Sequence, residues 1–567
     1  MARRIVVDPV TRIEGHLRIE CEVDKGQISK AWSSGTMWRG IELILKDKDP
    51  REAWIFTQRI CGVCTTVHAI ASVRAVENAL KLEVPMNAQH IRNMIIAAHG
   101  IFDHIVHFYH LSALDWVDIV SATKANPKAA ADLAAKLSPW PDNSAHGLKE
   151  VQDRLKKFVA SGQLGVFASG YWGHPAMKLS PEVNLLATSH YFQALDYQRK
   201  INQVVAILGS KTPHIQNLAV GGVSNPINPD SQSTLTVERL YYIKTLIDEI
   251  GDFINQVYQV DVAAIAAFYA DWTGYGAGVT NYLSVPEFPQ DTKGESFALA
   301  GGYIPDRDIS AFTPISSFND DFFNQGVKES VKHAYYKGDS NLHPWQGVTE
   351  PNFTGFQDDG KYSWVKAPTF QDKPAQVGPL ANVLAMYAAG HEATIRHANK
   401  ILSQAGALAG SKLGLELLHS TIGRHAGRTI RTGVLHEVLA EEWQSLMANI
   451  GRGDYATFNE PVFPKGEIQG VGFHEAPRGI LSHWVVIDKG KIKNYQCVVP
   501  STWNAGPRND KDEMGPYEAS LVGNPVADAD NPLEVLRTVH SFDPCLACAI
   551  HLFDPKHNSL VKVRTNG

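Results

Sequence analysis

Hydrophobic positions recur every three to four residues along five long stretches in the middle of the chain, a pattern typical of amphipathic helices. The stretches are residues 87–122, 182–208, 236–267, 379–404 and 413–449. Pro181 suits the start of the second helix and Gly209 suits its end. The length of these stretches predicts a helical bundle at the centre of the molecule.

Hydrophobic and polar positions alternate at the two ends of the chain, as they do in half-buried strands. The expected strands are residues 4–10, 17–23, 28–32, 484–487 and 492–499. Turn-forming residues at 24–27 and 488–491 predict one hairpin near each end. We expect these β-rich ends to pack together beside the bundle.

Residues 273–376 follow neither pattern and are rich in Gly, Pro, Ser and Asp. They also carry large aromatic side chains that need burial, namely Tyr275, Tyr282, Phe297, Phe312, Trp345, Phe353 and Trp364. An irregular α+β insertion is therefore expected here rather than a flexible linker. The predicted fold class is mainly α (α+β), with residues 1–551 folding as a single unit.

Composition narrows the class of protein. The chain has 567 residues, of which 44% are hydrophobic and 20% charged, so a large buried core is possible. A net charge of −6 lacks the basic excess of a general nucleic-acid binder. The longest apolar run, residues 262–270, is well below the roughly 18 residues that suggest a membrane span. Arg3-Arg4 lacks a following apolar region, so we expect another chain to carry any export signal.

Four of the six cysteines form two C-x-x-C pairs, Cys61 with Cys64 and Cys545 with Cys548. Four thiolates grouped in this way are a strong metal signal. A helical pattern follows the first pair, with Thr65 or Thr66 as its expected cap, so the helix dipole would favour thiolate there. Structural zinc, a catalytic transition metal and an iron–sulfur cluster all remain open from spacing alone. The other two cysteines, Cys21 and Cys497, are expected to be buried small side chains.

The segments around these pairs, Arg59–His68 and Asp543–His551, together resemble the paired signature of nickel–iron hydrogenase large subunits. Four further motifs extend the resemblance in the family's order: Arg12-Ile13-Glu14-Gly15-His16, Arg39-Gly40-Ile41-Glu42, Glu475-Ala476-Pro477-Arg478-Gly479 and Pro500-Ser501-Thr502-Trp503-Asn504-Ala505-Gly506-Pro507. The pattern is most similar to the membrane-associated uptake group, in particular its second enterobacterial respiratory type.

The resemblance implies an enzyme that oxidises H2 reversibly and heterolytically to protons and electrons. Cys61 and Cys545 would bind nickel terminally, while Cys64 and Cys548 would bridge nickel to an iron that carries two cyanides and one carbon monoxide. Glu14 would lie beside the Cys545 sulfur and accept a proton from it when that sulfur is protonated. In the plainer interpretation, Glu14 is a surface carboxylate paired with Arg12 or Arg18.

Further residues would surround the metals. Arg478 would lie over the open metal site, where it could polarise H2, act as a base or donate to a cyanide. Asp103 and Asp543 would position Arg478. Pro477 would shape the cyanide pocket, and Ser501 would donate to the other cyanide. His68 would donate to a bridging sulfur. Asp103 could instead form a helix-surface ion pair with His107, and His104, His107 and His110 could be ordinary core or interface histidines.

A second metal site, usually magnesium, would use Glu42, the Ala505 carbonyl and His551. Residues 552–567 would be an extension that an endopeptidase removes by cutting between His551 and Leu552, once insertion factors have loaded nickel and iron. The plainer interpretation is a frayed terminus.

With no cysteines left for an electron relay, an iron–sulfur small subunit is implied, with residues 170–175 and 211–223 as candidate contacts. Electrons would pass through it to membrane subunits that reduce quinone. The complex would mature in the cytoplasm, be exported with the small subunit and lie peripherally on the periplasmic side of the cell membrane. The alternatives are a zinc-stabilised structural or interaction subunit without hydrogenase activity, and a homologue that kept the fold without the metals.

Overall fold

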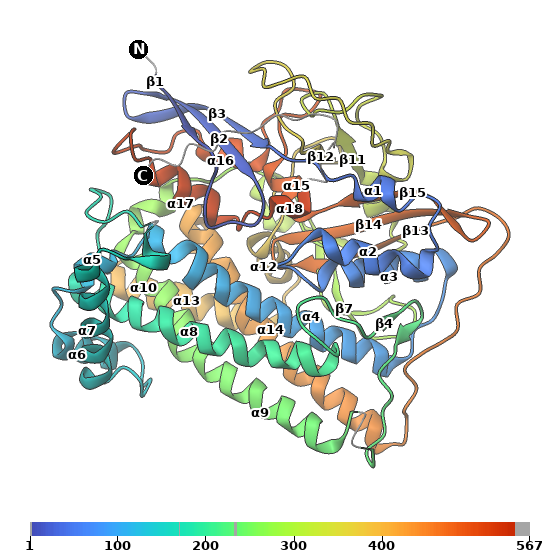
Figure 1. Cartoon of the computed structure of the whole chain (residues 1–567), viewed down its shortest axis with the longest axis horizontal. Coiled ribbons are helices and arrows are strands. Elements are labelled where there is room, and N and C mark those ends of the chain that lie inside the picture. The colour runs from blue at the N-terminus through green and yellow to red at the C-terminus, as the bar shows by residue number, and fades with distance from the viewer. Residues whose placement is uncertain (1–2, 169, 232–234, 550–567) are drawn as a thin grey trace.

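The centre of the molecule is a bundle of long helices. The computed structural model describes residues 3–168, 170–231 and 235–549. Helices α4 (Met86–Val106), α8 (Pro181–Leu208), α9 (Val237–Phe253) and α14 (Thr421–Gly451) pack side by side (Figure 1). Helices α10 (Gln259–Phe268) and α13 (Glu392–Ala409) pack against each other and against α14. The predicted helical core is present.

Of the five predicted helices, the first, third and fourth are interrupted, and the fifth starts later than predicted. The first is α-helical only to Val106 and continues as a π-helical turn, and a second π-helical turn separates α9 from α10. The fourth divides into α12 (Pro379–Ala388) and α13 around Gly390, whose φ of 77° is not helical. The fifth begins only at Thr421, where the Ser420 hydroxyl accepts from the Gly423 N–H at 3.0 Å. Hydrophobic spacing does not reveal the π-helical breaks because each is a single turn within an otherwise α-helical run.

The two ends of the chain form separate three-stranded antiparallel sheets. The first contains β1 (Arg3–Val7), β2 (Leu17–Asp24) and β3 (Gln27–Gly35), and the second contains β13 (Ile468–Ala476), β14 (Gly479–Asp488) and β15 (Lys491–Val498). Both predicted hairpins are present, and their turn residues Lys25-Gly26 and Lys489-Gly490 all have positive φ, as a type I′ turn requires. Strand β13 was not predicted. The ends meet where β3 packs on α16 (Pro516–Leu521).

Short elements fill the remaining layers. The helices are α1 (Ile41–Ile44), α2 (Ala53–Thr57), α3 (Val67–Leu80), α5 (Ile119–Ala122), α6 (Pro127–Leu137), α7 (Ala145–Ser161), α11 (Asp321–Gly326), α15 (Pro500–Ala505), α17 (Leu533–Ser541) and α18 (Leu546–Ala549). The strands are β4 (Leu218–Ala219), β5 (Gly222–Val223), β6 (Tyr282–Leu283), β7 (Glu287–Pro289), β8 (Phe297–Leu299), β9 (Gly301–Ile304), β10 (Thr313–Ile315), β11 (Val327–Ser330) and β12 (Ala367–Phe370). In the parts of the chain described, no helix is both long and apolar enough to cross a membrane.

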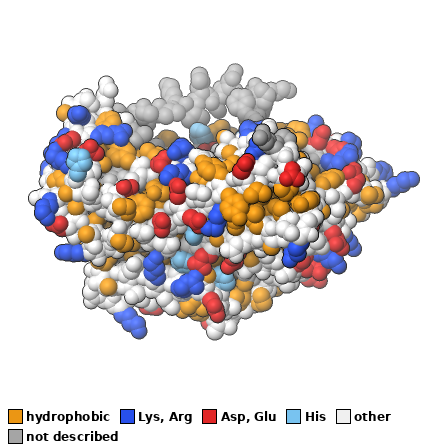
Figure 2. All heavy atoms as spheres, turned by 90° about the horizontal axis from the view of Figure 1, so that it is seen from below, with side chains coloured by type: hydrophobic (Ala, Val, Ile, Leu, Met, Phe, Trp, Pro, Cys, Tyr) orange, Lys and Arg blue, Asp and Glu red, His pale blue; other side chains and the backbone are white. Residues whose placement is uncertain are grey.

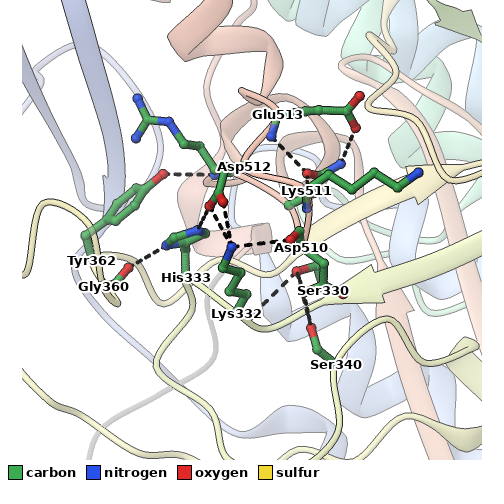
Figure 3. A network of polar contacts seen from close by, with 12 residues as sticks. Ser330, Lys332, His333, Ser340, Gly360, Tyr362, Asp510, Lys511, Asp512 and Glu513 are labelled. Atoms are coloured by element: carbon green, nitrogen blue, oxygen red, sulfur yellow. Dashed lines mark hydrogen bonds and ion pairs between the residues drawn. The ribbon is translucent and has the colours of Figure 1, made fainter.

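The insertion is the predicted irregular α+β region, with α11 and strands β6–β12 joined by loops. Its aromatic side chains are buried or half-buried except Phe353, which is 67% exposed and stacks on Trp364. Hydrogen bonds of Lys332 and His333 with Asp512 join the insertion to the loop at 509–513 in the C-terminal region (Figure 3).

The first C-x-x-C pair is brought to the C-terminal sheet because α3 packs on β13 and β14. Glycine makes this close approach possible. A Cβ atom at Gly472 of β13 would lie only 2.2 Å from the backbone nitrogen of Ala75 in α3. Helix and sheet thus fix the position of the residues that precede α3.

Candidate metal centre

Four cysteine sulfurs from opposite ends of the sequence meet in one buried cluster. The Sγ atoms of Cys61, Cys64, Cys545 and Cys548 all lie within 4.8 Å of one another, and none of these side chains is more than 4% exposed. The sulfurs pair across the two motifs, Cys61 with Cys545 at 3.3 Å and Cys64 with Cys548 at 3.0 Å. All four are free thiols. Such a set of soft donors can hold a thiophilic metal.

The loop that precedes α3 stabilises the thiolate form of Cys61. Its sulfur accepts the backbone N–H groups of Val63 at 3.3 Å and Cys64 at 3.2 Å. Although burial acts to raise the pKa of Cys61, hydrogen bonds from the neighbouring thiols bring it well below the usual value. Thr66 occupies the N-cap position of α3, as one of the two predicted caps, but its hydroxyl makes no capping hydrogen bond.

The second pair lies against the N-terminal segment. Glu14 and Cys545 form a parallel backbone bridge, in which Glu14 N–H donates to the Pro544 carbonyl and Leu546 N–H donates to the Glu14 carbonyl at 2.7 Å. Gly15 has a φ of 85°, and a Cβ atom there would lie 2.2 Å from the Ala547 nitrogen. The N-terminal motif is therefore built around the Cys545–Cys548 turn.

Arg39 joins the two cysteine segments directly. Its guanidinium donates to the carbonyl of Ile60, next to the first pair, and to the carbonyl of Ala547 at 2.6 Å, within the second. Arg39 had no predicted role beyond membership of a motif. Only the folded structure shows that one side chain reaches both segments.

A buried ion-pair group lies beside the sulfurs. Arg478 binds Asp103 through two hydrogen bonds of 3.0 and 3.1 Å and binds Asp543 at 2.9 Å, and all three side chains are almost fully buried. Burial opposes the charge on Arg478, yet the two carboxylates raise the pKa of its guanidinium well above the usual value. Burial raises the pKa of Asp543, against the effect of Arg478.

Asp103 is therefore no part of a surface ion pair. It is buried in α4, and the ring of His107 bonds instead to the His540 carbonyl at 2.6 Å. His104 and His107 are core residues, and half-buried His110 contacts Tyr191.

The His68 ring reaches the cysteine cluster, with Nε2 3.4 Å from the sulfur of Cys548, one of the two cysteines expected to bridge the metals. Its Nδ1 lies 3.0 Å from His483, which in turn contacts the Tyr495 hydroxyl at 2.7 Å. His483 and Tyr495 order the His68 ring and were missed in the sequence, where both lie within ordinary strand patterns. A histidine on a buried strand face was the only available signal.

A small cavity opens beside the cluster. It is lined by Cys64, His68, Pro477, Arg478, Ser501, Cys545 and Cys548, together with apolar side chains. The Ser501 oxygen accepts from the Cys545 N–H at 3.0 Å, so its own O–H can donate elsewhere. The structure thus brings Pro477, Arg478 and Ser501 to one wall.

Glu14 is half-buried at the edge of the centre. Burial, followed by the charge of Cys61, raises the pKa of its carboxyl, while Arg478 and Arg39 act to lower it. Arg12 pairs with Asp115 and Arg18 pairs with Glu20, so the two expected partners of a surface Glu14 are engaged elsewhere.

The residues expected to bind magnesium are only partly described. Glu42 is buried and accepts from the Cys497 N–H at 3.0 Å and from the Thr349 hydroxyl, while the Ala505 carbonyl accepts from Ser33 at 3.1 Å. His551 and Leu552, like the whole predicted extension, lie outside the described residues. Cys21 and Cys497 are buried, as predicted.

The donor set itself limits what can bind at the sulfurs. Burial raises the pKa of Cys64, Cys545 and Cys548, so four buried thiols would not ionise together without a nearby cation. A thiophilic transition metal meets this requirement. Zinc would meet it as well, so the choice of metal depends on wider similarity.

Comparison with known proteins makes that choice. Residues 39–551 match the nickel-dependent hydrogenase family, and residues 4–33 match a HoxL-like family model. The chain is 58% identical to the Hydrogenase-2 large chain of Escherichia coli K12, over 100% of both chains. It is 46% identical to the uptake hydrogenase large subunit of Bradyrhizobium diazoefficiens, over 99% of this chain and 97% of that one.

A solved structure agrees with these relatives. The Ni-Fe-Se hydrogenase of Desulfovibrio vulgaris Hildenborough in its reduced state superposes with a TM-score of 0.78 at 31% identity, over 97% of this chain and 100% of that one. Neither a zinc-stabilised scaffold nor a homologue without the metals is favoured by this combination of matches and buried cysteines. The chain belongs to the nickel-dependent hydrogenase family.

Proposed function

We propose that the four sulfurs hold a nickel–iron centre and that the chain is the catalytic large subunit of a respiratory uptake hydrogenase, which converts H2 into two protons and two electrons. The observation that carries this proposal is the cluster of Cys61, Cys64, Cys545 and Cys548 beside Arg478, in a chain of this family. In this proposal Cys61 and Cys545 would be the terminal nickel ligands, and Cys64 and Cys548, whose sulfurs lie 3.0 Å apart, would bridge nickel to iron.

When bound, the nickel–iron centre supplies the acceptor for the electron pair of the H–H bond. The Cys545 thiolate then holds the released proton, and Glu14 receives it because its raised pKa keeps its carboxylate basic enough. Arg478 acts as a fixed cation rather than a base, since Asp103 and Asp543 hold its guanidinium protonated. Through their hydrogen bonds, those two carboxylates keep the guanidinium aimed at the site.

The cavity beside the sulfurs suits iron ligands that the chain cannot supply. Its walls are apolar except for a few donors, of which Arg478 and Ser501 would each donate a hydrogen bond to one cyanide, while the apolar lining would accommodate carbon monoxide. We further assign a magnesium ion to Glu42, the Ala505 carbonyl and His551, because hard oxygen ligands suit it.

Electron exit requires a partner subunit with iron–sulfur clusters. A large-subunit relationship supports this heterodimer, and exposed apolar side chains such as Met37, Ile55 and Val348 offer surface for contacts. Figure 2 shows how such side chains gather among charged ones on one face of the molecule. Electrons would continue to membrane subunits that reduce quinone, with the complex peripheral on the periplasmic side after export with its small subunit.

Maturation completes the proposal. Metal insertion factors would load the centre in the cytoplasm, and an endopeptidase would then remove residues 552–567 by cutting after His551. The match to the family ends at residue 551, which supports a boundary there.

An infrared spectrum of the protein purified with its small subunit tests the proposed centre. We expect metal-bound cyanide and carbonyl stretches that shift under H2. A fully metallated, mature preparation without such bands would refute the nickel–iron assignment.

The role of Glu14 has a separate test. In Glu14→Gln, the infrared bands should remain while H2/D⁺ exchange falls by about 100-fold, because the amide cannot carry the proton. Unchanged exchange would remove Glu14 from the proton path without touching the metal assignment.

A further inference from the structure

A buried charged cluster lies on the far side of the segment that carries Glu14. Asp115 accepts hydrogen bonds from the Arg12 guanidinium and from His540 Nδ1, the latter at 2.7 Å. His540 Nε2 lies 2.8 Å from the Thr11 carbonyl oxygen. The side chains of Asp115 and His540 are at most 1% exposed, and that of Arg12 is 9% exposed.

Both ring nitrogens of His540 face hydrogen-bond acceptors, the Asp115 carboxylate and the Thr11 carbonyl oxygen. Burial acts to raise the pKa of Asp115, but Arg12 and His540 lower it to about 2, so the carboxylate stays ionised. Arg12 and His540 therefore share one carboxylate in the interior, an arrangement that is costly to desolvate and persists only if its geometry is well kept.

The cluster joins the two segments that meet at Cys545. Residues 11 and 12 are held by His540 and Asp115, and two residues later Glu14 pairs with Pro544 and Leu546 through its backbone. His540 itself lies in the last turn of α17, the helix that leads into the second cysteine pair. One short stretch of chain is thus fixed at both ends, and the residue at the second attachment is Glu14 itself.

We propose that Arg12, Asp115 and His540 form a buried clamp that positions Glu14 for proton transfer from Cys545. The three are positioning residues, since they act on the reaction only through residues 11–14. This inference rests on the proposed role of Glu14, and it adds a structural reason for the Arg12 position in the N-terminal motif. Loss of the clamp would displace the carboxylate, and displacements of about 1 Å can cost up to 100-fold in rate.

The test is a double-mutant cycle on the holoenzyme with its small subunit. Glutamine in His540→Gln cannot donate at both ring-nitrogen positions, so we expect about tenfold slower H2/D⁺ exchange with unchanged infrared bands. In the Glu14→Gln background, His540→Gln should cause no further loss, because the group that the clamp positions is already gone.

His333→Gln is the matched control. His333 also faces a carbonyl, that of Gly360 at 2.6 Å, and a carboxylate, that of Asp512 at 2.8 Å, but it lies in the insertion. The same substitution there should leave exchange at the wild-type rate. If His540→Gln does not assemble, Arg12→Lys replaces it, since lysine keeps the charge but cannot reach both Asp115 and the Leu111 carbonyl as Arg12 does.

The outcomes separate the two proposals. Equal losses with and without Glu14, or no loss from either clamp variant, would overturn the clamp while leaving Glu14 in the proton path. If Glu14→Gln alone has no effect on exchange, the role of Glu14 fails and the clamp inference fails with it. A loss that depends on Glu14 supports both.

Discussion

Two groups of charged side chains tie distant parts of the chain together, and they differ in exposure. Around Arg478, the side chains of the arginine and its partners Asp103 and Asp543 are 4%, 0% and 1% exposed. In the group around Lys332 (Figure 3), the side chains of the lysine and Asp512 are 39% and 59% exposed. The bond lengths are similar, at 2.9 to 3.1 Å in the first group and 2.7 Å in the second.

The difference shows what each group is for. Exposed pairs contribute only about 0–1 kcal/mol, so the Lys332 group serves mainly to align the insertion with the loop at 509–513. Burying a charge costs several kcal/mol and is seldom the best route to stability. The Arg478 group lies against the cysteine cavity, and its retention there agrees with a function in chemistry rather than in folding.

The largest effect is expected from Arg478→Met. Removing the guanidinium leaves two buried carboxylates without their partner, which should destabilise the fold by about 3–5 kcal/mol and lower H2/D⁺ exchange by about 100-fold. The urea midpoint for loss of the infrared bands measures the first effect, and exchange under saturating H2 measures the second.

Arg478→Lys is the companion variant. Lysine keeps the charge but not the planar fork that binds Asp103 through two nitrogens, so stability should largely recover while exchange stays low. Full recovery of exchange would show that charge alone is required. A wild-type urea midpoint for Arg478→Met would contradict the proposed cost of the buried charges.

The buried and exposed groups were not equally visible in the sequence. Periodicity predicted the helical core, and turn residues predicted both hairpins, because these features depend on neighbouring positions. The cysteine pairs could be grouped because their spacing is a local motif. Asp103 and Asp543 were assigned to Arg478 only through the family resemblance, since nothing in the spacing brings α4 to the turn between β13 and β14.

Other parts of the site had no local signal. The clamp residue Asp115 follows a π-helical turn that hydrophobic spacing did not distinguish from α-helix, and His540 sits in a short helix that was not predicted. Strand β13 carries glycines at its close approach to α3, which weakened its strand pattern. Contacts of this kind form only when whole elements pack against one another. No local pattern in the sequence therefore reveals them.

An intermediate effect is expected from Asp115→Asn, measured against pH. The pKa of Asp115 is lowered to about 2 from an ordinary 3.8, so its ionised form stabilises the folded chain above the unfolded pKa. We expect the free energy of unfolding of the wild type to exceed that of Asp115→Asn by about 2 kcal/mol near pH 7. This gap should narrow as pH falls from about 4 toward 2, where the folded carboxyl takes up its proton.

Urea midpoints of the two proteins at a series of pH values measure that gap. Asp115→Glu, which keeps the charge, should show most of the wild-type pH dependence. A gap that stays constant down to about pH 2 would mean that the charge of Asp115 does not contribute to stability.

The smallest effect is expected from Asp512→Asn in the exposed group. Hydrogen bonds from Lys332 and His333 lower the pKa of Asp512, so its contribution is also present above the ordinary aspartate range and lost below it. Because Asp512 is largely exposed, solvent and salt screen these contacts, and the loss should stay under about 1 kcal/mol and shrink further in high salt. H2/D⁺ exchange should not change. A loss of stability as large as that of Arg478→Met would show that burial does not distinguish the two groups. Ion pairs would then contribute as much to stability at the surface as in the core.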